Sequence, residues 1–90
     1  MFLVAKHRIS DPQRFWGAVR AAMARPQPAG VRLHGTYPNT DGTEAVCLWE
    51  ADALDTVRAA VDAAVGDSSR NEYYAVDPAN AIGLPEAMQR

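Results

Sequence analysis

The chain has 90 residues and a mass of 9.8 kDa, which is enough for one small domain with a modest hydrophobic core. Hydrophobic residues make up 48% of the chain and charged residues 22%, which excludes the disordered class. The formal net charge is -2 and the basic residues are scattered, so we expect no nucleic-acid binding. Cys47 is the only cysteine, which excludes a disulfide framework and zinc-finger spacing.

The N-terminal stretch MFLVAKHRIS predicts part of the mature fold rather than a targeting segment. It is too short for a secretory signal and meets charge at Lys6. No run approaches the roughly 18 apolar residues that a membrane-spanning helix needs. With the lone cysteine, these features predict a cytoplasmic protein without a membrane partner, and the arginine- and alanine-rich composition is typical of a GC-rich bacterial genome.

The first third of the chain predicts a strand followed by a helix. Phe2 to Ile9 is an apolar-leaning run, and Ser10-Asp11-Pro12 is typical of a helix start. A serine or aspartate oxygen can accept hydrogen bonds from unpaired amides there, and proline fits the first turn. Apolar residues then recur at helical spacing until Pro26: Phe15, Val19, Ala22 and Met23.

The middle of the chain predicts a hairpin. After a loop over 26–30, Val31 to Tyr37 reads as a half-buried strand. Its inward residues would be Val31, Leu33 and Tyr37, alternating with Arg32, His34 and Thr36. Asn39 to Gly42 predicts the turn, and the run 43–50 contains consecutive apolar residues from Ala45 to Trp49. A strand with this pattern is expected to be covered on both faces.

The last third predicts a second helix and a fourth strand. Asp52 is expected to cap the helix and Gly66 to end it. The apolar stripe of this helix contains Leu54, Val57, Val61, Ala64 and Val65. Residues 71–77 read as a strand, and residues 78–90 as an irregular C-terminal extension of a single domain over 1–90 with its core at about 2–77.

The order βαββαβ predicts an α+β ferredoxin-like sandwich, a four-stranded antiparallel sheet with two helices on one face. Two helices can cover only that face, yet the third strand is apolar on both. A second subunit packed on the other face would cover it, giving a homodimer. A C-terminal segment folded back over the sheet is the alternative, and we favour the dimer.

Several short motifs resemble the dimeric α+β-barrel superfamily. They are His7-Arg-Ile-Ser-Asp11 with Trp16, Gly30-Val-Arg-Leu-His34, the turn 39–42, and Trp49-Glu-Ala-Asp52. The resemblance implies a dimeric α/β barrel, as in small antibiotic-biosynthesis monooxygenases and stress-responsive A/B barrel proteins. The superfamily also includes polyketide cyclases, lactone isomerases and haem-degrading enzymes, but the chain has no intact haem-enzyme constellation.

His7 is the candidate catalytic residue. It shares a predicted strand face with Leu3, Ala5 and Ile9, and it lies at the end of that apolar face. A histidine at a pocket mouth can serve as an acid or base near neutral pH. The alternative is a structural histidine bonded to a carbonyl or a carboxylate.

His34 is a candidate ligand-binding residue that would share its strand face with Arg32 and Thr36. His7, His34 and Cys47 are ligand types that suit zinc, nickel or copper, but alternation does not place them on one face. We therefore predict no metal and no cofactor. Cys47 itself is interpreted as an inert buried thiol.

Four large aromatic residues of the strands are candidate ligand-binding residues: Tyr37, Trp49, Tyr73 and Tyr74. Such side chains can form walls for planar ligands, and they also serve in cores and interfaces. Motifs for phosphate binding and for common hydrolases are absent from the sequence.

These features predict a homodimer that binds a small ligand, aromatic or otherwise apolar, in an apolar pocket. One alternative is a cofactor-independent monooxygenase or cyclase of polyketide-type metabolism, with His7 as base or donor and Trp49 with a tyrosine orienting the ring. Another is a stress-related structural dimer without a pocket. Whether the protein is an enzyme stays open at this point.

Overall fold

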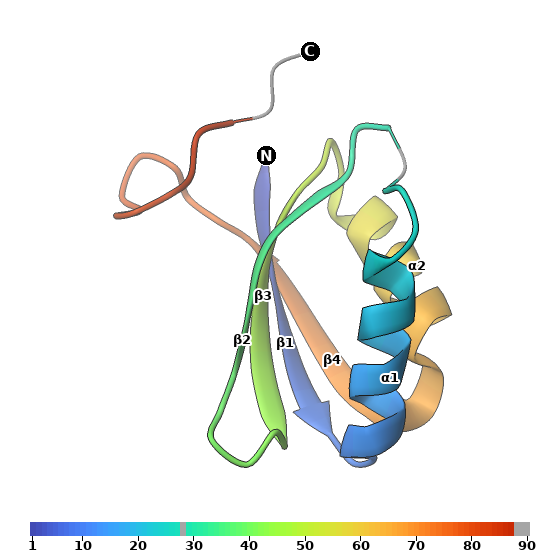
Figure 1. Ribbon diagram of the computed structural model, residues 1–90. Helices are drawn as coiled ribbons and strands as arrows, with labels where there is room; N and C mark the ends of the chain where they lie inside the picture. The colour runs from blue at the N-terminus through green and yellow to red at the C-terminus, as the bar shows by residue number, and fades with distance from the viewer. Residues whose placement is uncertain (28, 88–90) are drawn as a thin grey trace.

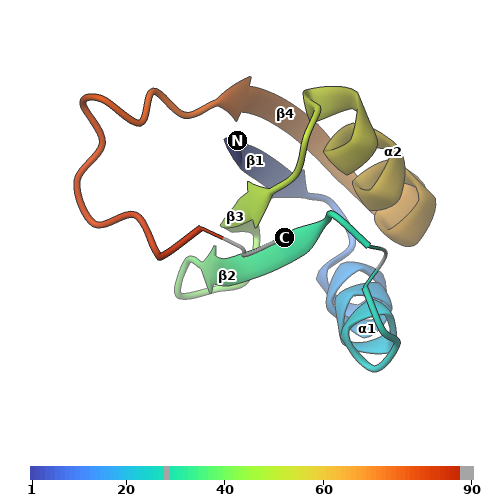
Figure 2. The same cartoon turned by 90° about the horizontal axis from the view of Figure 1, so that it is seen from above.

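The computed structural model describes residues 1–27 and 29–87 and has the predicted βαββαβ order. Its elements are β1 (Phe2–Ile9), α1 (Pro12–Met23), β2 (Arg32–Pro38), β3 (Glu44–Glu50), α2 (Leu54–Val65), the 3-10 turn η1 (Gly66–Ser68) and β4 (Ser69–Ala75). The four strands form one antiparallel sheet in the order β2-β3-β1-β4, and both helices cover the same face of it (Figures 1 and 2). The predicted ferredoxin-like α+β fold is thereby confirmed. No helix among the described residues is both long and apolar enough to cross a membrane.

The two helices begin differently. In α1, Asp11 is the N-cap, its Oδ1 accepts from the Arg14 amide at 3.1 Å, and Pro12 occupies the first turn, as predicted. In α2 the N-cap is Ala53 and no side chain makes a cap bond, so the prediction that Asp52 caps this helix is wrong. The chain here turns directly from β3 into a helix whose first residue is Leu54. The predicted end is correct, because Gly66 takes a positive φ of 57° that favours glycine.

The register of β1 decides which residues face the helices. Leu3, Ala5, His7 and Ile9 are all buried beneath them, while Lys6 and Arg8 are exposed on the other face. β3 pairs with β1 so that Ala45 lies opposite His7 and Trp49 opposite Leu3. β4 pairs on the other edge of β1, with Asn71 opposite His7 and Tyr73 opposite Ala5.

A β-bulge in β2 changes the predicted alternation. The pairing with β3 shifts between Leu33 and Gly35, so His34 is an extra residue in the strand. Beyond the bulge, Thr36 pairs with Cys47 on the helix side and Tyr37 pairs with Val46 on the other side. The predictions that Tyr37 faces inward and that His34 shares a face with Thr36 are therefore wrong. The bulge moves every later side chain to the opposite face.

Smaller differences concern the boundaries of strands. β2 begins at Arg32 and extends to Pro38, one residue beyond the prediction, and β4 spans Ser69–Ala75 rather than 71–77. The predicted loop over 26–30 includes Pro28, which lies outside the described residues.

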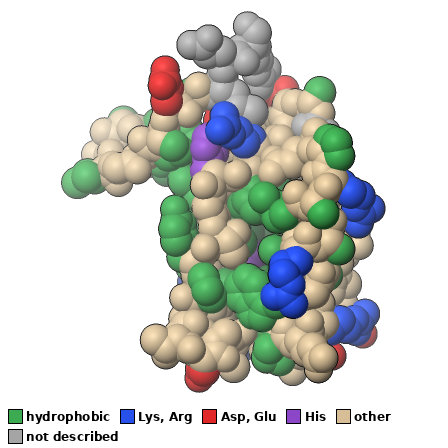
Figure 3. Space-filling model, viewed as in Figure 1, with side chains coloured by type: hydrophobic (Ala, Val, Ile, Leu, Met, Phe, Trp, Pro, Cys, Tyr) green, Lys and Arg blue, Asp and Glu red, His purple; other side chains and the backbone are tan. Residues whose placement is uncertain are grey.

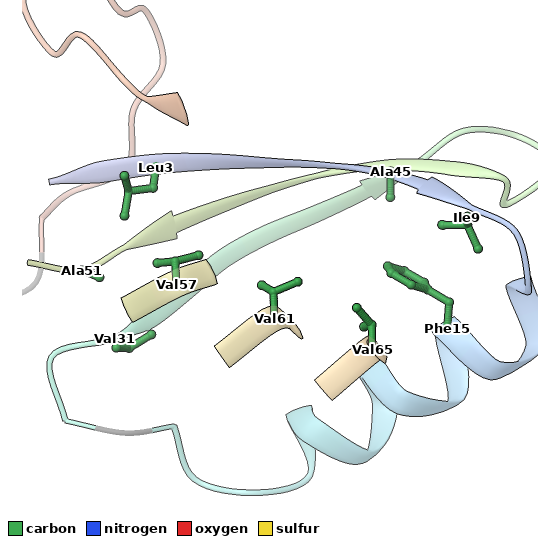
Figure 4. Packing of buried hydrophobic residues seen from close by; sticks show 9 residues of the cluster. All are labelled: Leu3, Ile9, Phe15, Val31, Ala45, Ala51, Val57, Val61 and Val65. Carbon is green, nitrogen blue, oxygen red and sulfur yellow. The ribbon is translucent and has the colours of Figure 1, made fainter. Parts of the chain in front are cut away.

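The hydrophobic core lies between the helices and the sheet (Figure 4). Phe15 of α1 and Val57 of α2 are fully buried against it, so the predicted apolar stripes face the sheet in part, whereas their members Met23 and Ala64 are exposed. The buried members of this cluster are Leu3, Ile9, Phe15, Val31, Ala45, Ala51, Val57, Val61 and Val65.

The sheet face opposite the helices, here called the open face, stays partly uncovered. Residues 76–87 form no helix or strand and leave the end of β4 on the open-face side of the sheet (Figures 1 and 2). Tyr37, Val46 and Tyr74 remain 63%, 41% and 53% exposed there. The face of β3 that looks away from the helices thus carries Val46 and Leu48 between two glutamates, and Val46 is exposed in the single chain.

Candidate functional site

A cavity of about 340 Å³ lies between the sheet and the two helices. Its walls come from α1, α2, β1, β2 and β3, together with residues of the loop between α1 and β2. Figure 3 shows this side of the molecule hollowed between β2 and α1, with apolar side chains around the hollow. Both the volume and the apolar lining are typical of sites for small organic molecules.

His7 borders the cavity. β1 holds its ring on the helix side, 5.2 Å from the ring of Phe15 between centroids. Its Nδ1 lies 2.6 Å from Oδ1 of Asn71, the residue directly opposite it in β4. The same oxygen accepts a hydrogen bond from Ser69 Oγ at 2.7 Å. Because an amide oxygen only accepts, the imidazole proton is on Nδ1 and Nε2 keeps its lone pair.

The protonation of His7 follows from its surroundings. Burial lowers the pKa of His7 below its usual value of 6.5, and the hydrogen bond to Asn71 acts in the opposite direction. The ring is therefore neutral at pH 7. Within the described residues Nε2 has no hydrogen-bond partner, so His7 offers the cavity an acceptor or a base.

Trp49, Cys47 and Thr36 border the cavity from β3 and β2. The indole Nε1 of Trp49 is buried and has no hydrogen-bond partner among the described residues. A buried donor without a partner costs about 1–3 kcal/mol. Cys47 Sγ donates to Thr36 Oγ1 at 3.5 Å, and burial raises the pKa of the Cys47 thiol, so the sulfur is protonated and a poor nucleophile.

The tyrosines predicted to bind ligand lie elsewhere. Tyr73 faces the helices, but its hydroxyl donates to Asp62 Oδ1 at 3.1 Å and the Arg58 guanidinium lies 5.4 Å from its ring centroid. Burial, followed by the charge of Asp62, raises the pKa of Tyr73. Tyr37 and Tyr74 lie on the open face. The three tyrosines are thus not brought together with His7 and Trp49.

His34 also lies on the open face. Its Nε2 is 2.8 Å from Glu50 Oε1, and the two side chains are 8% and 9% exposed. The ring of Phe2 packs against it with centroids 5.5 Å apart. The sheet therefore separates His34 from His7 and Cys47. Within residues 1–27 and 29–87, no group of three or more His, Cys, Asp or Glu side chains is placed to hold a metal.

Sequence reasoning missed several cavity residues, including Phe15, Met23, Arg25, Gln27 and Thr36. The apolar helix positions carry the same signal as ordinary core residues. The bulge in β2 conceals Thr36, since simple alternation places it on the other face. Arg25 and Gln27 belong to the loop after α1, where periodicity gives no information.

The cavity thus combines a largely apolar wall, the neutral imidazole of His7 and, in the loop after α1, the polar side chains of Arg25 and Gln27. The unpartnered Nε1 of Trp49 is buried within its wall. The βαββαβ topology alone does not identify a reaction, because the same fold hosts unrelated functions. Inference about function therefore rests on the cavity residues themselves. No family model, curated protein or solved structure matches this chain.

Proposed function

We propose that this protein binds a small apolar molecule, aromatic or of similar size, in the cavity between its sheet and its helices. The observation that carries this proposal is the preformed cavity of about 340 Å³ with its largely apolar lining. A ligand that fills the cavity would remove apolar surface from water, and each Å² of that surface contributes roughly 25 cal/mol of favourable binding free energy. The cavity favours ligand binding over a stress-related structural dimer with a solid interior.

Two polar groups would orient the bound molecule. Trp49 lines the cavity, and a ligand acceptor that reaches its buried Nε1 would satisfy a donor that has no partner among the described residues. His7 Nε2 can accept from a hydroxyl or an amine. A few polar groups in an apolar cavity are what gives such sites their selectivity.

The second candidate function is a cofactor-independent monooxygenase or cyclase. It is favoured by the neutral His7, whose tautomer is set by Asn71 and whose side chain lines the cavity. In this role Nε2 would remove a proton from an acidic C–H or O–H group of the ligand. Trp49 would orient the ring alone, because no tyrosine is among the described residues that line the cavity.

The homodimer belongs to the same proposal. The open face exposes Tyr37, Val46 and Tyr74 in the single chain, and a second copy would cover them. The cavity lies on the opposite side of the sheet, so dimer formation leaves its walls in place.

Ligand binding is tested by filling the cavity. Ala22 of α1 lines the cavity, and Ala21 is an exposed neighbour on the same helix that does not. We expect 2-naphthalenemethanol to bind the unmodified protein and the Ala21→Phe control, and Ala22→Phe to weaken binding by roughly tenfold or more, or about 1.4 kcal/mol, in isothermal titration calorimetry. Equal binding by both variants would place the ligand outside this cavity.

The enzyme alternative has a separate test. With 1,8-dihydroxyanthrone as probe, one O₂ would be consumed per anthrone, giving the anthraquinone and one water. Oxygen uptake above the uncatalysed rate that is lost in His7→Gln, while 2-naphthalenemethanol still binds, would support a base at His7. An uncatalysed rate with both proteins would leave ligand binding as the function of the cavity and reject this oxygenation.

A further inference from the structure

The cavity has one charged side chain in its wall. Arg25 follows Ala24, the C-cap of α1, and its amide donates to the carbonyl of Ala22 at 3.2 Å, which fixes the backbone at this point. The other cavity residues are uncharged, since none is Asp, Glu or Lys and His7 is neutral. Within residues 1–27 and 29–87 Arg25 forms no ion pair.

Gln27 adds an oriented amide beside this charge. Its Oε1 accepts from the Leu33 amide at 2.9 Å, and Gln27 also lines the cavity. Because an N–H group can only donate to the oxygen, this bond fixes which end of the side-chain amide is which. The Nε2 hydrogens of Gln27 are left as donors next to the cavity. Arg25 and Gln27 thus offer donors only, from the same loop.

An apolar cavity with a lone cation at its edge favours a ligand with one negative charge. A guanidinium forms bidentate hydrogen bonds with carboxylates, and an adjacent amide can donate a further one. We propose that the ligand is an amphipathic monoanion whose carboxylate lies between Arg25 and Gln27 and whose apolar body fills the cavity. This inference rests on the proposed function and narrows its ligand to one chemical class.

The sheet register gives the direction of the ligand. Leu33, which holds Gln27, is paired with Trp49, whereas His7 is paired with Ala45, farther along β3. Four residues of strand span about 13 Å. The carboxylate end therefore lies at the Trp49 end of the cavity, and the far end of the apolar body points toward His7 and Phe15.

The experiment compares two ligands of nearly equal size, 2-naphthoate and 2-naphthalenemethanol, by calorimetry with the full chain. We expect naphthoate to bind the unmodified protein more tightly than the alcohol does. Arg25→Gln should weaken naphthoate roughly three- to tenfold and leave the alcohol unchanged. Arg25→Lys should retain part of the preference. Arg20→Gln removes an exposed charge of α1 outside the cavity and should alter neither affinity.

The outcomes separate this inference from the function on which it rests. If the alcohol binds as tightly as naphthoate, or if Arg20→Gln has the same effect as Arg25→Gln, the carboxylate site is wrong and the apolar cavity stands. If neither compound binds the unmodified protein, the proposed function fails and the inference fails with it. A preference for naphthoate that weakens with added salt and disappears in Arg25→Gln supports the site.

Discussion

The two histidines show how strongly position decides the chemistry of a residue. His7 contacts an amide oxygen and an aromatic ring, so its uncharged form is favoured. His34 lies against a carboxylate on the other face of the same sheet. One imidazole thus keeps a lone pair in a residue that lines a cavity, and the other is hydrogen-bonded to Glu50. Only the first is placed to act on a cavity ligand.

The lowered pKa of His7 predicts a pH effect on stability. Since the folded pKa is below the unfolded value of 6.5, the unfolded chain takes up a proton first as the pH falls. Above pH 6.5 His7 is neutral in both states and does not change the free energy of unfolding. As the pH drops from 6.5 toward the folded pKa of His7, protonation of the unfolded chain lowers the free energy of unfolding. The slope from one such group is at most about 1.4 kcal/mol per pH unit.

Chemical denaturation of the unmodified protein and of His7→Gln, between about pH 7.5 and about pH 5.5, measures this effect. We expect the free energy of unfolding to fall less steeply with acid in the variant. His34→Gln serves as the control for the other histidine. Parallel pH profiles for the unmodified protein and His7→Gln would show that His7 does not carry the effect.

At the scale of elements, local signals fix the helices better than the strands. Asp11-Pro12 predicts the start of α1 because capping is a local hydrogen bond, and Gly66 predicts the end of α2 because few other residues tolerate a positive φ. The bulge at His34 depends on pairing with β3, so β2 alone does not reveal it. The same shift separates Tyr37 from the cavity and brings Thr36 to it.

The candidate site was predictable only in part for the same reason. His7 and Trp49 reach the cavity from regular strands, where alternation holds. Tyr73 has the expected face, yet its hydroxyl is bound by Asp62 of α2, a contact between elements that the sequence pattern does not contain. Arg25 and Gln27 lie in a loop, where position depends on tertiary contacts such as the bond to Leu33.

The cap of α1 gives a prediction at this scale. Asp11→Ala removes the acceptor of the Arg14 amide, and we expect a loss of about 0.5–2 kcal/mol in the free energy of unfolding. Asp11→Asn keeps a side-chain oxygen at the cap and should retain most of that stability. Urea denaturation of the three proteins measures both. An equal loss in both variants would assign the effect to the charge of Asp11 rather than to the cap bond.

At the scale of the whole molecule, the fold has a layer of two helices packed on a sheet, and the open face of that sheet has no second layer against it (Figure 2). Alongside its exposed apolar side chains, the open face carries charges of both signs. In the sheet register, Lys6 lies opposite Glu72 of β4 and Arg8 lies opposite Glu44 of β3. None of these four side chains forms an ion pair within the described chain. A surface with both charges can be complementary to itself about a two-fold axis. The prediction of a second copy as the partner is based on these features.

The assembly prediction is that the protein sediments as a dimer of 9.8 kDa chains and that Val46→Glu converts it to a monomer. Val46 is 41% exposed near the middle of β3, so a two-fold interface on the open face would bury two new carboxylates. Burying unpaired charge costs several kcal/mol, and we expect the dissociation constant to rise by about 100-fold or more. Ala59→Glu, on the exposed side of α2, adds the same charge away from the sheet and should stay dimeric.

Equilibrium sedimentation over a range of concentrations measures all three proteins. A 9.8 kDa species for the unmodified chain throughout that range would reject the dimer. The cavity, whose walls all come from one chain, would remain intact in that case.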